Sequence, residues 1–321
     1  MDDTHMEPIF PPPDKLLAEL EPAAEQLLNR HLGMAKEWFP HDYIPYALGR
    51  DYDKDPWTPD QPRISGVAQI AFEVNLLTED NLPSYHREIF RTFGAGDGAW
   101  INWVNRWTAE EGRHAIVLRD YLVVTRNIDP YALERGRMNQ LQTAYHHDNG
   151  GNVLRGLAYV AFQELATRIS HRNTGRFSSD PVADRIMTRI ASDENLHMVF
   201  YRDILSEAIR IDPSAAVHAI ADEITDFQMP GAGMVNFTRK AAQIAKAGIY
   251  DLRVHHDEVI WPLLNHWRVF DLQNLDPSAE LRREELSRFL TGLDIQASRF
   301  EAWRARSAER ASENTRGDLT G

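Results

Sequence analysis

The sequence predicts an all-α protein built on a four-helix bundle, and three observations support this fold class. Apolar residues recur at steps of three and four over long segments, which is the period of an amphipathic helix. No segment shows the alternation that is typical of a strand. Two Glu-x-x-His motifs, Glu111–His114 and Glu194–His197, lie on two such segments. Glu79 and Glu164 lie on two further segments of this kind, each without such a motif. A bundle with this pattern holds a carboxylate-bridged di-iron or di-manganese centre.

The expected elements follow from helix signals and breakers along the chain. Residues 1–13 end in Phe-Pro-Pro-Pro and are expected to form a disordered arm. A first helix is expected from Asp14, which would cap it, and the proline-rich residues 38–63 should form a loop. The bundle is expected to consist of residues 65–78, 97–125, 152–171 and 180–210. Pro83 should mark a break after the first of these helices. The third should end near Asn173-Thr174-Gly175, and Asp180 should cap the fourth.

Shorter helices are expected around this bundle. One should lie within residues 126–150, and the others are expected over 214–228, 233–247, 254–269 and 277–308. The polar segment 307–321 is expected to form a disordered tail. The sequence therefore predicts a single domain over residues 14–306.

Composition excludes several kinds of site and partner. The chain of 321 residues has no cysteine, which excludes disulfides, zinc–thiolate sites, iron–sulfur clusters and cysteine nucleophiles, so any metal needs oxygen and nitrogen ligands. The formal net charge of −13 argues against non-specific nucleic-acid binding. No apolar run approaches the ~20 residues of a membrane helix, and the chain does not open on a signal segment. We expect a cytoplasmic protein.

Four expected helix faces carry a glutamate within an apolar stripe. The stripes are Phe72, Leu76, Glu79, Leu82; Trp100, Val104, Trp107, Glu111, His114, Leu118, Tyr121; Val153, Leu157, Val160, Glu164, Thr167; and Ala183, Met187, Ile190, Glu194, His197, Tyr201, Ile204. Each buried carboxylate costs several kcal/mol unless a cation compensates it, and too few lysines or arginines lie on these faces. Two divalent metal ions would balance four carboxylates. The alternative is that each motif lies on a solvated helix face.

Two further acids adjoin the motifs. Glu110 and Asp193 each immediately precede a glutamate of a Glu-x-x-His motif. Because metal-bound histidines usually donate their second ring N–H to a carboxylate, both acids are candidates to orient His114 and His197. The alternative is that they are ordinary acids of a helix surface.

Five stretches resemble the soluble acyl-(acyl carrier protein) desaturase family, most closely its actinobacterial branch. The likeness covers roughly residues 14–270. The stretches are Glu-Trp-Phe-Pro-His-Asp-Tyr-Ile-Pro (37–45), Thr-Glu-Asp-Asn-Leu-Pro-Ser-Tyr (78–85), Trp-Thr-Ala-Glu-Glu-Gly-Arg-His (107–114), Phe-Gln-Glu-Leu-Ala-Thr-Arg-Ile-Ser-His-Arg-Asn-Thr (162–174) and Asp-Glu-Asn-Leu-His (193–197).

The resemblance implies a homodimer of ferritin-like subunits that inserts a cis double bond into a saturated acyl chain on its carrier protein. The reaction would need dioxygen, two irons per subunit and electrons from a ferredoxin-type donor. The implied metal ligands are Glu79, Glu111, His114, Glu164, Glu194 and His197. Thr167 matches the family threonine beside the oxygen-binding face, where it would relay a proton or merely pack in the core. Trp38, Asp193 and His114 match a proposed electron route from the surface.

The resemblance also sets expectations for the substrate and its carrier. One departure is Gly112, where the family usually has asparagine. An apolar channel is expected beside the metals, lined partly by Phe72, Leu76, Trp107 and Leu157, although each fits plain core equally well. Because the carrier protein is acidic, its docking site should be basic, and the candidates are Arg239, Lys240 and Lys246 or Arg168, Arg172 and Arg176.

Several other functions share parts of this pattern. A di-iron hydroxylase or monooxygenase would use the same six ligands on a carrier-bound or small-molecule substrate. A non-catalytic acyl-carrier-binding paralogue is disfavoured because every ligand is present. A ferritin is disfavoured by the helices expected after residue 210, and a ribonucleotide-reductase small subunit by the desaturase motifs.

Overall fold

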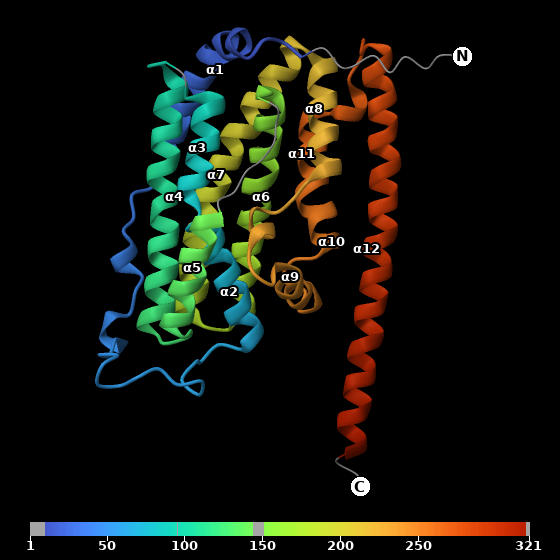
Figure 1. Cartoon of the computed structure of the whole chain (residues 1–321). Helices are drawn as coiled ribbons and strands as arrows, with labels where there is room; N and C mark the ends of the chain where they lie inside the picture. Colours follow the sequence, from blue (N-terminus) through green and yellow to red (C-terminus); the bar gives the residue numbers. More distant parts are fainter. Residues whose placement is uncertain (1–9, 95, 144–150, 319–321) are drawn as a thin grey trace.

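The computed structural model describes residues 10–94, 96–143 and 151–318, and Figure 1 shows that helices make up the body of the molecule. The described residues contain no strand, which confirms the predicted all-α class. None of the described helices is both long enough and apolar enough to cross a membrane.

Four helices form the bundle at the centre of the fold: α2 (Gly66–Glu79), α4 (Ala99–Val124), α6 (Val153–Ser178) and α7 (Pro181–Ile211). Helices α2 and α7 each contact both α4 and α6, which closes the bundle. Two more helices cover it, because α1 (Pro13–Met34) contacts α4 and α7, and α3 (Leu82–Phe93) contacts α4 and α6. The loop between α1 and α2 contains only two short 3-10 turns, Pro40–Asp42 and Tyr46–Leu48.

Side-chain caps fix where three of the bundle helices begin. Ser65 accepts a hydrogen bond from the backbone N–H of Ala68 at the start of α2. Asn152 does the same for α6, and Asp180 for α7, each accepting from two N–H groups of the first turn. These residues satisfy N–H groups that have no partner within the helix. The predicted cap at Asp180 is therefore confirmed.

The first helix begins one residue earlier than expected. Pro13 is its first residue and Pro12 occupies the cap position, so Asp14 lies in the first turn instead of capping it. The first turn suits both residues, because proline needs no hydrogen-bond partner there and an acid complements the helix dipole. The predicted arm over 1–13 lies mostly outside the described residues.

Pro83 begins a helix that we did not expect. The chain leaves α2 at Asp80, and α3 starts at Leu82 with the proline in its first turn. Proline is tolerated at that position, so the same residue that ends one helix opens the next.

Gly175 does not end α6, which continues to Ser178. A Cβ on Gly175 would lie 2.8 Å from Cβ of Met187 and 3.2 Å from Cα of Asp184, both on α7. The glycine is therefore used for close packing of two helices, and we wrongly interpreted it as a helix stop.

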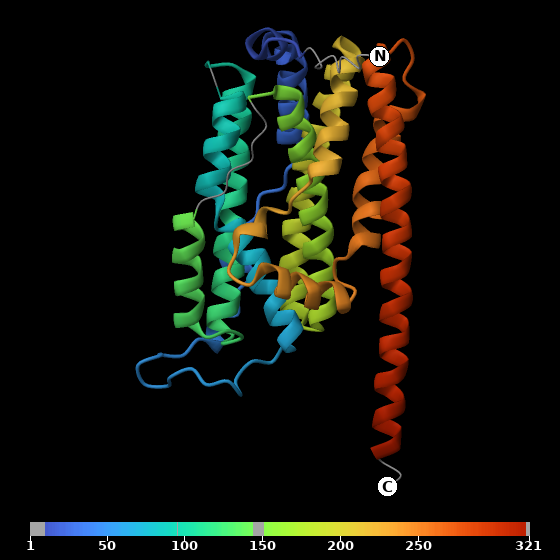
Figure 2. The same cartoon turned by 45° about the vertical axis from the view of Figure 1, so that its right-hand side comes forward.

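Further helices pack outside the bundle. They are α5 (Pro130–Thr143), α8 (Pro213–Asp226), α9 (Phe237–Lys246), α10 (Leu252–Val254), a π-helix (His255–Ile260), α11 (Trp261–Trp267) and α12 (Pro277–Asp318), with 3-10 turns at Pro230–Gly233 and Val269–Asp271. Helix α8 joins α12 to the bundle through its contacts with α6 and α12. In both views the C-terminal part of α12 extends beyond the other helices (Figures 1 and 2).

The last helix ends later than expected. The chain stays helical as far as Asp318, whereas we expected a disordered tail from Ser307. Alanine, glutamate and arginine are frequent in this segment and favour a helix even where few contacts support it.

Candidate metal centre

The six side chains predicted as metal ligands come together inside the bundle. Helix α2 supplies Glu79 and α6 supplies Glu164, while α4 and α7 each supply one Glu-x-x-His motif. All six are buried, and the most exposed, Glu111, has only 7% of its surface accessible. Helical periodicity explains the convergence, because residues three apart lie on the same face of a helix.

The six residues form two ligand groups that share Glu111 and Glu194. The ligand atoms within each group lie within 4.8 Å of one another. The first group is Glu79, Glu111, His114 and Glu194, and the second is Glu111, Glu164, Glu194 and His197. Two glutamates common to both groups are placed to bridge two metal ions.

The separate oxygens of the shared glutamates face different histidines. Nδ1 of His114 lies 3.5 Å from Oε2 of Glu111 and 3.5 Å from Oε1 of Glu194. Nδ1 of His197 lies 2.7 Å from Oε1 of Glu111 and 3.9 Å from Oε2 of Glu194. The two glutamates that belong to one group each also face the histidines. Glu79 lies 3.5 Å from Nδ1 of His114, and Glu164 lies 3.5 Å from Nδ1 of His197.

These facing atoms fit a pair of cations. Both Nδ1 atoms, both oxygens of Glu194, Oε1 of Glu111 and Oε2 of Glu164 are buried without a hydrogen-bond partner among the described residues. Burial and the charges of Glu194 and Glu111 raise the pKa of Glu164 well above its usual value. Buried acceptors without donors are costly, and metal ions are the partners that satisfy several at once.

Each metal-facing histidine has an acid on its opposite nitrogen, supplied by the other motif. Nε2 of His114 lies 3.5 Å from Asp193, which precedes Glu194. Nε2 of His197 lies 2.9 Å from Glu110, which precedes Glu111. The structure thus places both acids where they would fix the rings with Nδ1 towards the centre.

Trp38 contacts one of these acids. Its indole N–H donates to Asp193 over 2.7 Å, and its ring is nearly parallel to that of His114, with centroids 6.4 Å apart. Arg113 and Arg189 both pair with the same acid and lie over the Trp38 ring. The three residues of the expected electron route are therefore in contact.

Thr167 lies one turn after Glu164 and is buried. Its hydroxyl is within 3.1 Å of the carbonyl oxygens of Gln163 and Glu164, to which it donates. A hydroxyl bonded to its own helix must turn before it can donate to another group. Its role in proton transfer stays a prediction.

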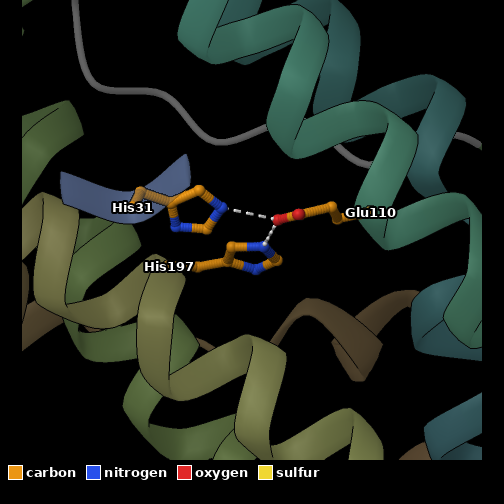
Figure 3. Close-up of side chains that lie close together, drawn as sticks. All are labelled: His31, Glu110 and His197. Atoms are coloured by element: carbon orange, nitrogen blue, oxygen red, sulfur yellow. Dashed lines mark hydrogen bonds and ion pairs between the residues drawn. The ribbon is translucent and has the colours of Figure 1, made fainter. Parts of the chain in front are cut away.

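Three residues beside the centre were not singled out as ligand partners from the sequence. Nε2 of His171 lies 2.7 Å from Glu79, and the Trp107 indole N–H donates to Glu164 over 3.0 Å. Burial alone would lower the pKa of His171, but its carboxylate neighbours outweigh burial and raise it to about 9. The third residue is His31, on α1 (Figure 3).

A narrow cavity opens beside the centre. It has a volume of about 40 Å³, which is far below the range of small-molecule sites. Its walls come from α3, α4, α6 and a turn after α8, and consist of Tyr85, Glu88, Ile89, Thr92, Phe93, Trp107, Gly156, Tyr159, Val160, Gln163 and Pro230. Of the four predicted lining residues Trp107 is among them, whereas Phe72, Leu76 and Leu157 are buried in the core and do not line this cavity.

Gly112, between two ligands, has room for a side chain. A Cβ there would meet only Leu82, at 3.9 Å, which is an ordinary contact. A Cβ is therefore tolerated here, and nothing in the structure explains why glycine stands at this position.

The comparisons with known proteins agree with this geometry. The profile described as fatty acid desaturase matches residues 14–316. The chain belongs to the fatty acid desaturase family. Within this family it is similar to a Mycobacterium tuberculosis protein provisionally named acyl-(acyl carrier protein) desaturase DesA1, with 48% identity over 306 residues that cover 92% of this chain and 90% of the relative.

The chain is also similar to a plant desaturase and to a solved structure. Stearoyl-(acyl carrier protein) 9-desaturase 6 of Arabidopsis thaliana is 32% identical over 255 residues, covering 74% of this chain and 63% of that protein. The X-ray structure of the M. tuberculosis protein provisionally named acyl-(acyl carrier protein) desaturase DesA2 matches with a TM-score of 0.67 and 28% identity. That match covers 84% of this chain and 99% of the other, and it confirms the predicted ferritin-like helical fold.

Proposed function

We propose that the protein is an acyl-(acyl carrier protein) desaturase, which introduces a cis double bond into a saturated acyl chain on acyl carrier protein. The observation that carries the proposal is the pair of ligand groups sharing Glu111 and Glu194, in a chain 48% identical to a relative named for this activity. Removing hydrogen from two unactivated methylene carbons requires a cofactor, because no side-chain acid or base can do it.

The donor set suits two irons per subunit, and it also suits manganese. Bound there, iron would supply the activation of dioxygen and the oxidation of the acyl chain. Glu111 and Glu194 would bridge the two ions, and the remaining four ligands would complete one site each. The Trp107 N–H would hold Glu164, and His171 would hold Glu79, in position.

The acyl chain would enter this narrow cavity once its walls move apart. Trp107 lines the cavity and donates to Glu164, and Gln163 precedes that ligand, so the cavity ends next to the proposed centre. Its mostly apolar walls would exclude water and hold the chain in a fixed position. Thr167, one turn from Glu164, is proposed to pass a proton towards the centre once its hydroxyl turns.

The proposed activity also requires an electron donor and a docking site for the carrier protein. Electrons from a ferredoxin-type donor would pass through Trp38, Asp193 and His114, which are in contact. For the carrier dock, Lys240 pairs with Glu73 and Arg172 with Asp184, so those cations are already engaged within the subunit. The position of the dock, the homodimer and the cytoplasmic location stay predictions.

Mass spectrometry of carrier-bound acyl chains tests the proposal. The iron-loaded protein, given saturated acyl carrier protein, reductant and dioxygen, should yield chains lacking two hydrogens. The variant Glu194→Gln removes one bridging anion at nearly constant volume and should lose both metal and product.

Two outcomes would contradict the desaturase assignment. Chains that gain an oxygen atom would identify a hydroxylase. Chains that return unchanged at every length from metal-loaded protein would favour a non-catalytic carrier-binding protein.

A further inference from the structure

His31 connects the first helix to the proposed metal centre. It lies near the end of α1 and is buried, with 4% of its surface accessible. Its Nε2 lies 2.9 Å from Oε2 of Glu110, and Nε2 of His197 lies 2.9 Å from the same oxygen. Figure 3 shows the two imidazoles, from α1 and α7, directed at one carboxylate of α4.

This geometry fixes the roles of the three groups. With a metal ion bound between Nδ1 of His197 and the ligand carboxylates, the proton of this ring would lie on Nε2, which would donate to Glu110. The shared oxygen also accepts from Nε2 of His31, whose Nδ1 has no hydrogen-bond partner among the described residues. Burial alone would raise the pKa of Glu110, but its two histidine partners outweigh burial and lower the pKa far below its usual value.

Packing holds the His31 ring in place as firmly as its hydrogen bond does. The ring stacks on His197 with centroids 5.8 Å apart and an interplanar angle of 24°. Its other neighbour is Trp103, which meets it edge-on at 5.0 Å. A ring fixed by both neighbours leaves Glu110 little freedom to move away from His197.

The triad of His31, Glu110 and His197 is a poor cation site in its own right. A metal ion on Nδ1 of His197 would leave the proton of the ring on Nε2, which then could not bind a second ion. Glu110 is also compensated by Arg106 and Arg113, which approach its second oxygen. A third metal would face these cations and displace two hydrogen bonds.

In the other half of the centre, Trp38 takes the place that His31 has here, because it donates to the acid on His114 and its ring is nearly parallel to that histidine. Asp193, the acid on His114, is held by Trp38, Arg113 and Arg189. A defect at His31 should therefore affect only the half that contains His197.

We infer that His31 is a positioning residue, which holds Glu110 so that Glu110 fixes the His197 ring and retains the metal bound by Glu164 and His197. The inference rests on the metal centre of the proposed function but not on the acyl substrate. Partners that orient a metal-bound histidine typically change metal affinity by about 10–100-fold when removed.

Two variants separate the hydrogen bond from the packing. His31→Phe keeps an aromatic ring between Trp103 and His197 and removes the donor. His31→Gln keeps an N–H near the position of Nε2 and removes the ring. Leu28→Ala is the matched control, since it trims another buried residue of α1 that has no polar group to pair with Glu110.

The experiment is the release of Co²⁺ from the loaded full-length variants to a chelator, followed by visible absorption. From His31→Phe, one ion should leave about 10–100-fold faster than from the unsubstituted protein and the second at an unchanged rate. His31→Gln and Leu28→Ala should release both ions at rates close to the unsubstituted rate. The substitution Glu164→Ala should leave only the ion in the His114 half. In that background, adding His31→Phe should not change the rate at which this ion is released.

Three results would overturn the inference. Equal release from His31→Phe and Leu28→Ala would reduce His31 to a packing residue. Faster release of both ions would remove the selectivity for one half. A third ion lost in His31→Phe would make the triad a metal site. Each result is independent of alkene formation, so protein that binds two ions and makes no alkene refutes only the proposed function.

Discussion

Replacing Gly175 with alanine should destabilise the protein, although alanine is the better helix former. The new Cβ would lie 2.8 Å from Cβ of Met187 and 3.2 Å from Cα of Asp184. Carbon atoms in good contact are about 3.5–4.0 Å apart, so α6 and α7 would have to separate. Neither α7 atom can swing aside, because one is in the backbone and the other is attached to it.

A second glycine in a bundle helix provides the matched control. Gly112→Ala places its Cβ 3.9 Å from Leu82 and creates no clash. Both substitutions gain about 1 kcal/mol from helix propensity, and this gain cancels in their difference. What remains is the cost of overpacking, about 1–3 kcal/mol. Gly112→Ala should therefore be more stable than the unsubstituted protein, and Gly175→Ala less stable than Gly112→Ala by that amount.

Thermal unfolding of the metal-free variants, followed by circular dichroism, measures the difference. For a chain of this size, 1–3 kcal/mol corresponds to about 2–5 °C between the two midpoints. Urea unfolding should rank the stabilities of the two variants in the same order. Equal midpoints, or a higher midpoint for Gly175→Ala, would refute the close approach of α6 and α7 at this glycine.

Two further predictions concern the centre, and a third concerns His255 of the π-helix. Trp107→Phe removes a hydrogen bond to buried Glu164 worth about 1.5–3 kcal/mol, so chelators should remove metal about 10–100-fold faster, and unchanged release would contradict this. Trp38→Phe removes the N–H that binds Asp193, and stopped-flow mixing with reduced donor should show slower reduction at unchanged metal content. Burial and a neighbouring histidine lower the pKa of His255 from 6.5 to about 4. The unfolded chain therefore takes up this proton first, and stability should fall by about 1–3 kcal/mol between pH 6.5 and pH 4, a slope that His255→Asn should reduce in urea titrations.

The convergence of the six candidate ligands could be predicted from the sequence, because each of them lies on a face of regular helix. Periodicity places Glu194 and His197 together whatever the rest of the fold does. His171 carried a similar signal, since it lies two turns after Glu164, although the sequence does not show that it contacts Glu79. His31 carried no such signal, because its contact with Glu110 depends on how α1 packs against the bundle.

Other elements were misjudged because one residue type serves several purposes. Glycine commonly ends a helix, but Gly175 permits contact between two helices. Proline commonly breaks a helix, but Pro83 begins one. Apolar stripes mark buried faces without distinguishing close-packed core from cavity wall, which explains why Phe72 was expected in the channel.

Glu111 and Glu194 would be shared by two metal ions inside the bundle. Anomalous diffraction at the iron edge, from crystals of the iron-loaded protein, tests this arrangement most directly. The account predicts two peaks per chain, about 3.5–4 Å apart, one beside Nδ1 of His114 and the other beside Nδ1 of His197. A single peak, or peaks outside the space between these histidines, would contradict it.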